Sequence, residues 1–532
     1  MMGKLFFNMT NTQILDCTLR DGGYINDFQF GEYGIRKIIS QLTNAGIDII
    51  ECGFLEDGEY DSNASVFNTV EQIANFIPKD RKKTMYVAMA CYGEYDISQL
   101  SPYDGKSIDG IRVTFHYNEV APALEYCQEI MDKGYKVFVQ PVGTTSYTDE
   151  QLLDLIHKVN ELQPYAFYLV DTLGLMHKND VIRFFYLIDH NLSKTINMGF
   201  HSHNNLQLSY SNCQALASVE SDRTISLDSS VYGMGRGAGN LNTELIASYL
   251  NEYQSRRYEV EPILEVVDEF ILKIKAEHEW GYSVPYYLAA INGCHPTYAS
   301  YLSGKQTLTV RNIATILRMI EPEKRSLFNK AIAEEKYLEF QSNEINDEST
   351  IEQLKSAITG RNVLVIAPGP SLATNQEVVL QIAKEKNCMV IAATFVPDFI
   401  ETDYVFLSNL KRYSTTFNPT HKQINLIHTS NIKVEETEKM VVNYSSLLNE
   451  EDVIRDNTSA MLLNLLSRLN PASIYLAGLD GYKLNGDNYY LNRLKLQTGD
   501  YYKELNETMT NKINTVRQVL NIAFVTPSLY NV

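Results

Sequence analysis

The chain has 532 residues, which is too long for one hydrophobic core and predicts several domains. Apolar residues make up 44% and charged residues 21%, as is typical of a globular enzyme or binding protein in water. The formal charge of −19 disfavours nucleic acid as a partner, because phosphate backbones would be repelled.

The sequence also predicts a cytoplasmic protein without a membrane span. The longest apolar runs, such as Val363–Pro368, are far shorter than the roughly 20 residues of a membrane helix. The segment Met1–Phe7 lacks the long apolar region of a secretion signal. The seven cysteines are scattered and odd in number, which favours reduced thiols over a disulfide framework or a zinc ribbon.

Short β-branched runs alternate with helix-period segments over residues 1–250. Strands alternating with helices imply right-handed crossovers and a parallel sheet, and eight such units predict a closed (β/α)8 barrel. Thr148 and Gln151 predict a capping box at the start of one intervening helix. The expected strands are Gln13–Cys17, Ile47–Cys52, Thr84–Ala88, Gly110–Phe115, Lys136–Gln140, Ala166–Val170, Met198–His201 and Thr224–Leu227.

The pattern changes after the barrel. Long helical segments, including Ile263–Ala276 and Thr309–Ile320, predict a helical extension at 251–345 that completes the barrel domain. Polar and acidic residues predict a linker at 346–358. A second α/β pattern predicts a Rossmann-like domain at 359–532. Its expected strands are Val363–Ala367, Cys388–Thr394, Tyr404–Ser408, Asn425–Thr429 and Ser473–Gly478.

Polar residues follow the predicted barrel strands, where active sites of such barrels form. His201 and His203 are two residues apart, so both imidazoles point to one side of extended backbone. Asp21 follows the first strand. In a closed barrel the first and seventh strands are separated only by the eighth, so Asp21 lies near the two histidines. Two imidazoles and a carboxylate suit Mn²⁺ or Mg²⁺ better than zinc, because no cysteine is clearly placed as a ligand. An isolated His-x-His is more often two surface or core histidines, but this strand-end position favours a metal site.

Two neighbouring segments add candidate groups. The Arg20 guanidinium beside the metal would stabilise negative charge developing on an enolate, and a salt bridge from Arg20 to Glu51 or Asp171 is the alternative role. Gly233–Asn240 is too rich in glycine for a helix or strand. It predicts a mobile loop that brings Asn240 onto the ligand.

These residues lie in segments that resemble the DRE-TIM metallolyase superfamily, which includes 4-hydroxy-2-oxovalerate aldolase, HMG-CoA lyase and the isopropylmalate synthases. The resemblance implies that Asp21, His201 and His203 bind a divalent metal. It also implies that Asn240 completes the shell and that Arg20 stabilises the enolate of a pyruvate-like 2-oxo acid. The matching segments, in family order, are Leu15–Gly22, Ile50–Phe54, Asp171–Gly174, Gly199–Asn205 and Gly233–Asn240.

The chain departs from two members of this superfamily. The 4-hydroxy-2-oxovalerate aldolases place a histidine acid/base shortly after the Arg-Asp-Gly turn, where this chain has Gly23 and Tyr24. Tyr24 is therefore the candidate for proton transfer, although its ordinary pKa near 10 makes it a poor base. HMG-CoA lyases carry a cysteine in the loop where this chain has Arg236. We name Arg20, Tyr24 and Glu51 as catalytic candidates, and favour a packing role for His295.

Val363–Leu372 reads as a strand, a Gly/Pro turn and a helix start, whose amides would favour an anion. With the later segments Asp456–Ala460 and Ile474–Tyr482, it is similar to Rossmann-like domains of the motility-accessory and sialyltransferase-like group. The similarity implies a nucleotide or nucleotide-sugar pocket near Gly369, Ser371 and Asp480. An inactive structural or dimerisation domain is the alternative.

The leading hypothesis is a divalent-metal-dependent aldolase or lyase that forms or cleaves a carbon–carbon bond through the enolate of a 2-oxo acid such as pyruvate. An aldehyde would be the second substrate, and we expect a homo-oligomer, most simply a dimer. The fused domains would suit synthesis of an unusual sugar or a surface glycan. Two alternatives remain: a Claisen-type acyl-CoA condensing transferase on the same barrel, and a barrel that binds metal and ligand without turnover.

Overall fold

The computed structural model describes residues 11–254, 256, 258–416, 425–432, 440–483 and 499–531. Met1–Phe7, interpreted above for its lack of a secretion signal, lies outside these residues. The chain forms two compact units, the first comprising residues 1–299 and 321–328 and the second residues 300–320 and 329–532. None of the described helices is both long and apolar enough to cross a membrane.

The first unit contains a closed parallel barrel. Its sheet order is β1-β9-β8-β7-β6-β5-β4-β2-β3, and β1 also pairs with β2, which closes eight strands into a ring with β3 attached to β2. The predicted (β/α)8 barrel is confirmed. The two-residue strand β3 was not predicted, because so short a segment leaves no alternation in the sequence. The strands are β1 Thr12–Asp16, β2 Ile49–Leu55, β3 Val66–Phe67, β4 Met85–Cys91, β5 Gly110–Phe115, β6 Lys136–Pro141, β7 Ala166–Asp171, β8 Asn197–Ser202 and β9 Ile225–Ser229.

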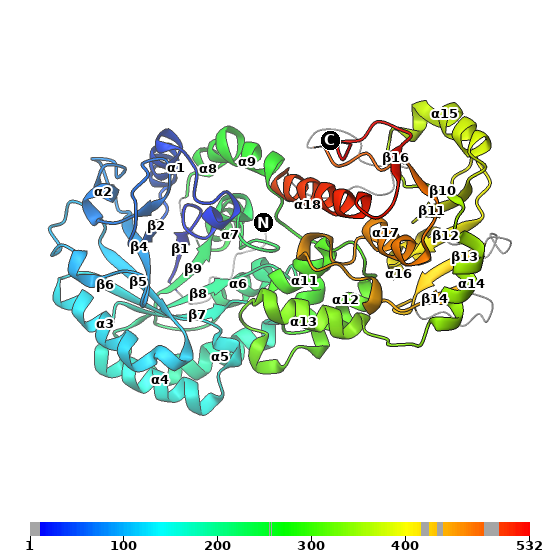
Figure 1. Ribbon diagram of the computed structural model, residues 1–532. Coiled ribbons are helices and arrows are strands. Elements are labelled where there is room, and N and C mark those ends of the chain that lie inside the picture. Colours follow the sequence, from blue (N-terminus) through cyan, green and yellow to red (C-terminus); the bar gives the residue numbers. More distant parts are fainter. Residues whose placement is uncertain are drawn as a thin grey trace, which may run out of the picture. The chain divides into compact units, whose positions relative to one another are not determined.

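Helices follow the barrel strands and lie on the outside of the ring, as α3, α4 and α5 show (Figure 1). The predicted capping box is confirmed, because Thr148 Oγ1 accepts from the Gln151 amide at the start of α4. The helices of this region are α1 Glu32–Asn44, α2 Val70–Ala74, α3 Val120–Asp132, α4 Asp149–Leu162, α5 Lys178–Asn191, α6 Ser209–Ala217 and α7 Thr243–Tyr253, with 3-10 turns η1 Gly22–Ile25, η2 Ile97–Gln99, η3 Tyr117–Glu119, η4 Thr144–Ser146 and η5 Val231–Gly233.

Alternate residues of the strands face opposite sides of the barrel wall. Ile14 and Ile50 pack in the large core cluster formed with the surrounding helices. Leu15, Ile49 and Phe138 pack in a separate, smaller cluster inside the ring. This period of two is why the functional side chains at the strand ends point into the barrel mouth.

The helical region predicted at 251–345 is divided between the two units. The predicted helix Ile263–Ala276 forms as α8 and α9 joined by a π-helical segment. Residues 346–358, expected as a linker, largely form helix α14, because Ile351, Leu354 and Ile358 recur at helical spacing and are buried. The elements are α8 Glu261–Val266, η6 Val267–Ile271, α9 Leu272–Glu277, α10 Val284–Ile291, α11 Pro296–Gly304, α12 Val310–Met319, η7 Pro322–Lys324, α13 Lys330–Gln341 and α14 Glu348–Ile358.

The second unit is built on a parallel sheet of order β14-β13-β12-β11-β10-β15-β16, which confirms the predicted α/β pattern. Chain order runs outward from β10 to β14 on one side and then returns to β15 and β16 on the other. The boundary between β10 and β15 is therefore the topological switch point. The elements are β10 Asn362–Ile366, β11 Met389–Ala393, β12 Tyr404–Leu407, β13 Asn425–Thr429, β14 Met440–Val442, β15 Ser473–Ala477, β16 Ile522–Phe524, α15 Leu372–Glu385, α16 Leu410–Thr416, α17 Thr458–Leu469 and α18 Gly499–Arg517, with 3-10 turns η9 Ser445–Leu447 and η10 Asp452–Ile454.

Both faces of this second sheet are covered. Val363 and Val365 of β10 pack in one core cluster with residues of α14, α17 and α18. Leu364 and Ile366, which alternate with them, pack in another cluster with Leu372 of α15. Burial on both faces explains why β10 reads as a continuous apolar run rather than an alternating one.

Candidate metal centre

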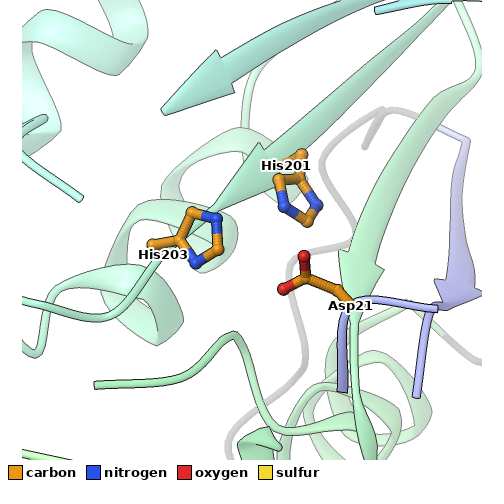
Figure 2. Close-up of side chains that lie close together, drawn as sticks. All are labelled: Asp21, His201 and His203. Atoms are coloured by element: carbon orange, nitrogen blue, oxygen red, sulfur yellow. The ribbon is translucent and has the colours of Figure 1, made fainter. Parts of the chain in front are cut away.

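Three predicted ligands meet at the carboxyl ends of the barrel strands. Asp21 lies in the turn after β1, His201 lies on β8, and His203 follows one residue after β8 ends. One ligand atom from each lies within 4.8 Å of the other two, and all three side chains are buried. Figure 2 shows the Asp21 carboxylate directed toward the two imidazole rings. Mutual distances of this size can be spanned by one cation bound at ordinary coordination distances.

The glycine loop 233–240 closes one side of this cluster. Asn240 Nδ2 donates to Asp21 Oδ2 at 2.7 Å and to the Met234 carbonyl at 3.2 Å. A Cβ on Gly235 would lie 2.5 Å from Asn240 Nδ2 and 3.1 Å from Asp21 Oδ2, so only glycine permits this approach. Asn240 Oδ1 is buried and has no hydrogen-bond partner within the described part of the chain. This oxygen could serve as a fourth ligand, and the role of Asn240 in the metal shell stays a prediction.

Two of the ligands, His203 and Asp21, have the protonation states that a metal requires. Burial lowers the pKa of His203 to about 3, although the nearby Asp21 carboxylate opposes the shift, so this imidazole is neutral at neutral pH. Burial would raise the pKa of Asp21, but Arg20 and the two histidines hold it well below its usual range. A neutral imidazole and an ionised carboxylate can bind a cation without first releasing protons.

Arg20 joins Asp21 to Glu51. Its Nη1 donates to Asp21 Oδ1 at 2.7 Å, and its Nε donates to Glu51 Oε2 at 2.8 Å. The salt bridge considered for Arg20 therefore forms with Glu51, whereas the Asp171 carboxylate accepts from the amides of Leu175 and Met176. Arg20 Nη2 is buried without a partner among the described residues. One donor of the guanidinium thus remains for a ligand.

Two further charged residues continue this network and were not predicted. Arg112 Nη1 donates to Glu51 Oε2 at 2.8 Å, and Arg112 Nη2 donates to Asp228 Oδ2. Asp228 Oδ2 also lies 2.9 Å from His201 Nδ1. Burial would raise the pKa of Asp228, but Arg112 and His201 lower it below its usual value. An arginine inside the apolar strand Gly110–Phe115 was the sequence signal that could have indicated this network.

The charges of this network leave a place for a cation. Three buried carboxylates, those of Asp21, Glu51 and Asp228, face two buried guanidinium groups, those of Arg20 and Arg112. The five groups therefore carry one net negative charge. Uncompensated buried charge is unfavourable, and a divalent cation at the three ligands would reverse its sign. The donor set of two imidazoles, a carboxylate and an amide oxygen fits Mn²⁺ or Mg²⁺ with open positions.

Tyr24 and His295, the remaining candidates of the first unit, do not belong to the three-residue ligand cluster. Tyr24, on η1, is 37% exposed, and the Arg236 guanidinium carbon lies 4.0 Å from the centre of its ring. Burial raises the pKa of Tyr24, with Arg236 opposing the shift. His295 Nδ1 accepts from the Thr297 amide at 3.3 Å, and burial lowers the pKa of His295 to about 4. Both groups are therefore uncharged at neutral pH.

A pocket in the second unit contains two of the three residues predicted to bind a nucleotide. Gly369 and Asp480 line it, together with Lys305, Arg412 and Asp456. It opens where β10 and β15 end, at the switch point of the sheet, where ligands of open α/β sheets bind.

The third residue, Ser371, is already engaged within the turn. Its amide donates to Asp480 Oδ2 at 2.6 Å, and its hydroxyl donates to Asp480 Oδ1 at 2.5 Å. The anion at this turn is therefore a carboxylate of the chain itself.

Comparison with known proteins places the first unit in context. Residues 11–268 match the family model described as HMGL-like. Over 243 residues the chain is 25% identical to an oxaloacetate decarboxylase of Mycobacterium tuberculosis, covering 44% of this chain and 69% of that protein. Over 251 residues it is 28% identical to a 4-hydroxy-2-oxovalerate aldolase of Thermomicrobium roseum, covering 46% of this chain and 68% of that protein. The HMG-CoA lyase structure from Brucella melitensis matches with 15% identity and a TM-score of 0.38, covering 48% of this chain and 96% of the lyase chain.

Proposed function

We propose that residues 11–268, which belong to the HMGL-like family, form a divalent-metal-dependent carbon–carbon lyase of the aldolase class. Its substrate would be a 2-oxo acid that reacts through an enolate, such as pyruvate or a compound that releases pyruvate. The sequence relatives support this class, because an oxaloacetate decarboxylase and a 4-hydroxy-2-oxovalerate aldolase are both among them. Both named activities act on 2-oxo acids by cleaving a bond one carbon away from the keto group.

The observation that carries the proposal is the pair of unpartnered polar atoms beside the ligand cluster. Asn240 Oδ1 and Arg20 Nη2 are both buried, and no atom of the described residues bonds to either. Leaving two such groups unsatisfied costs several kcal/mol in total, at about 1–3 kcal/mol each. An acceptor and a donor left open beside Asp21, His201 and His203 are what a cation and a substrate oxygen would satisfy.

The chain's own residues then have distinct tasks. Asp21, His201, His203 and Asn240 Oδ1 would hold Mn²⁺ or Mg²⁺, which when bound supplies a Lewis acid and a template for the carboxylate and keto oxygens. Arg20 Nη2 would donate to the oxygen on which negative charge develops, and Glu51 holds the guanidinium in place.

Proton transfer at the reacting carbon is the task we assign to Tyr24. Its raised pKa keeps the hydroxyl protonated at neutral pH, so it would act first as an acid that delivers a proton. Its partial exposure leaves it accessible from the mouth of the barrel.

Exchange of the methyl protons of pyruvate into deuterated water tests the proposal without knowledge of the second substrate. Proton NMR of pyruvate with the purified protein and Mn²⁺ should show loss of the methyl signal, and a chelator should stop it. Absence of exchange with Mn²⁺, Mg²⁺ and other divalent cations would favour a barrel that binds ligands without turnover.

Product analysis then separates the reactions that share this enolate. Cleavage of 4-hydroxy-2-oxo acids to pyruvate and an aldehyde identifies an aldolase. Carbon dioxide release from oxaloacetate identifies a decarboxylase. Release of free CoA from acetyl-CoA in the presence of pyruvate identifies the Claisen-type transferase.

For the second unit we propose a nucleotide or nucleotide-sugar site at the switch-point pocket. Because the Asp480 carboxylate already accepts from Ser371, phosphate groups would be repelled from that turn. They would lie instead toward Lys305 and Arg412, the basic residues of the lining. Calorimetric titration with CMP, UDP-glucose and ATP tests this, with Arg412→Ala expected to weaken binding. If none of the three binds, the domain is better explained as structural.

Two broader expectations also stand as proposals. The fusion of a lyase with a nucleotide-sugar domain suits synthesis of an unusual sugar or a surface glycan. A homodimer is the expected assembly, and light scattering of the purified protein measures it directly.

A further inference from the structure

One layer inside the barrel is charged where aliphatic residues usually fill such barrels. Residues from every second strand form it: Glu51 from β2, Arg112 from β5, Tyr168 from β7 and Asp228 from β9. Arg112 is fully buried and contacts the other three. It pairs with Glu51 and Asp228, and its guanidinium carbon lies 4.8 Å from the centre of the Tyr168 ring. The layer is therefore organised around one arginine.

A glycine on the neighbouring strand makes room for the Tyr168 ring in this layer. A Cβ on Gly199 of β8 would lie 2.1 Å from the Tyr168 ring, so glycine is required there for the ring to occupy the interior. Gln140 of β6 adds a further partner. With its amide oxygen turned toward Arg112, it accepts from Arg112 Nε at 3.1 Å. The guanidinium thus has an acceptor on each edge.

Asp228 connects this layer to the metal ligands. Its Oδ2 accepts from Arg112 and lies 2.9 Å from His201 Nδ1. A carboxylate that accepts at this position requires the proton of the imidazole to be on Nδ1, which leaves the lone pair of Nε2 for a cation. The alternative tautomer would set two acceptors against each other.

Arg112 connects the same layer to Arg20. Glu51 Oε2 accepts from both guanidinium groups, at 2.8 Å from Arg112 Nη1 and 2.8 Å from Arg20 Nε. A continuous series of charged groups therefore runs from His201 through Asp228, Arg112 and Glu51 to Arg20. One end is His201, a proposed metal ligand. The other end is Arg20, the group proposed to stabilise the developing negative charge.

We propose that Arg112 and Asp228 are positioning residues, which fix the tautomer of His201 and the placement of Arg20 through one shared layer of the barrel interior. The catalytic purpose of this positioning rests on the proposed function. The tautomer of His201 and the affinity for Mn²⁺ can be measured without turnover. Both side chains are buried and bonded to other groups of the layer, so we assign them an action through His201 and Arg20 rather than on the substrate. A buried ion pair that only stabilises the fold would not affect the tautomer of His201.

Asp228→Ala tests the tautomer directly, because it removes the acceptor that holds the proton on Nδ1. The matched control is Asp189→Ala. Asp189 is also a buried aspartate paired with a buried arginine, Arg223, at 2.8 Å, on α5 at the outside of the barrel. Nitrogen NMR of the histidine-labelled, metal-free full chain reports which ring nitrogen of His201 carries the proton, with His201→Gln used for assignment.

The expected result is a proton on Nδ1 of His201 in the unaltered protein and in Asp189→Ala. In Asp228→Ala we expect a shift toward Nε2 and a fall of Mn²⁺ affinity by roughly 10- to 100-fold. A proton on Nε2 of the unaltered protein would overturn the proposal. The proposal would also be overturned if the variant at Asp228 had the same His201 tautomer and the same Mn²⁺ affinity as the control at Asp189.

Arg112→Lys tests the connection to Arg20. An ammonium keeps the charge but cannot bridge two carboxylates with the fixed geometry of a guanidinium. We expect Mn²⁺ affinity to fall only a few-fold while pyruvate exchange falls by more than tenfold, whereas Arg223→Lys changes neither.

Failure of the proposed function and failure of this inference give different results. If the unaltered protein exchanges no pyruvate, the function is lost but the tautomer and Mn²⁺ titration still decide the role of Asp228. If exchange is normal in Arg112→Lys, the positioning role of Arg112 is contradicted while the function stands.

Discussion

The two units have their candidate sites at equivalent positions, the carboxyl ends of parallel strands, but the buried polar groups of the two sites differ in how far they are paired. At the barrel mouth, polar atoms of Arg20 and Asn240 are buried without partners in the described chain. In the second unit, both pocket carboxylates are engaged. Asp480 accepts twice from Ser371, and Asp456 Oδ2 accepts from the Tyr337 hydroxyl.

We interpret this difference as one between the proposed catalytic site and the proposed binding site. An unsatisfied donor and an unsatisfied acceptor cost stability, and that cost is recovered only when a cation and substrate bind. Groups that already satisfy one another have no such requirement. The comparison therefore predicts that substitutions at the barrel mouth act mainly on catalysis, whereas those around Gly369 and Asp480 act mainly on stability and ligand affinity.

His201→Ala should produce the largest effect, because it removes a ligand and the partner of Asp228 together. We expect Mn²⁺ binding and pyruvate exchange to fall below detection. Mn²⁺ titration and proton NMR in deuterated water measure the two. His157→Ala is the control, since that histidine is exposed on α4. Exchange by His201→Ala in chelator-treated buffer would contradict the metal centre.

Arg20→Lys should separate binding from chemistry. The ammonium can keep one of the bonds to Asp21 and Glu51, but it cannot also supply the open donor of the guanidinium. We expect Mn²⁺ affinity within a few-fold of the unaltered protein and exchange lower by about 10²–10³-fold. Arg223→Lys, at a buried ion pair outside the barrel, should leave exchange unchanged. Equal exchange rates in the two variants would remove Arg20 from the mechanism.

Tyr24→Phe tests the proposed proton donor in the cleavage direction, with an expected fall of about 10- to 100-fold in pyruvate release from a 4-hydroxy-2-oxo acid, at or below the lower end for acid–base catalysis. The pKa of Tyr24 is raised, so the hydroxyl stays protonated at neutral pH and loses its proton only above the ordinary value near 10. Activity that needs the acid should therefore persist through neutral pH and decline as pH rises past that value. This alkaline decline should be absent in Tyr24→Phe. Tyr33→Phe is the matched control, because the Tyr33 side chain on α1 is exposed. Identical pH profiles for all three proteins would exclude Tyr24.

The sequence predicted the strands far better than the connections between their side chains. All eight barrel strands were located, because each is a short, mostly apolar run. The strands β3, β14 and β16 were not, because they have only two or three residues each. Asp21, His201 and His203 were predicted because strand ends converge in any such barrel. Arg112 and Asp228 were not assigned a role, because which interior residues share a layer depends on the stagger between strands. The linker expected at 346–358 became α14 because its three apolar residues outweigh its polar composition.

The smallest expected effect concerns the second unit and compares one substitution in both regions. A Cβ on Gly369 would lie 2.2 Å from the Gly478 carbonyl oxygen, so Gly369→Ala must move backbone and should destabilise the second unit by about 1–3 kcal/mol. In α1 of the barrel, a Cβ on Gly34 makes ordinary contacts with the Phe270 ring at 3.5 Å and the Phe30 Cβ at 3.8 Å, and Gly34→Ala should stabilise by about 0.5–1 kcal/mol. Scanning calorimetry measures both, and pyruvate exchange should be unchanged in each variant. A large loss of exchange in Gly369→Ala would mean that the second unit acts on the chemistry of the first, and the contrast between a reactive barrel and a binding domain would fail.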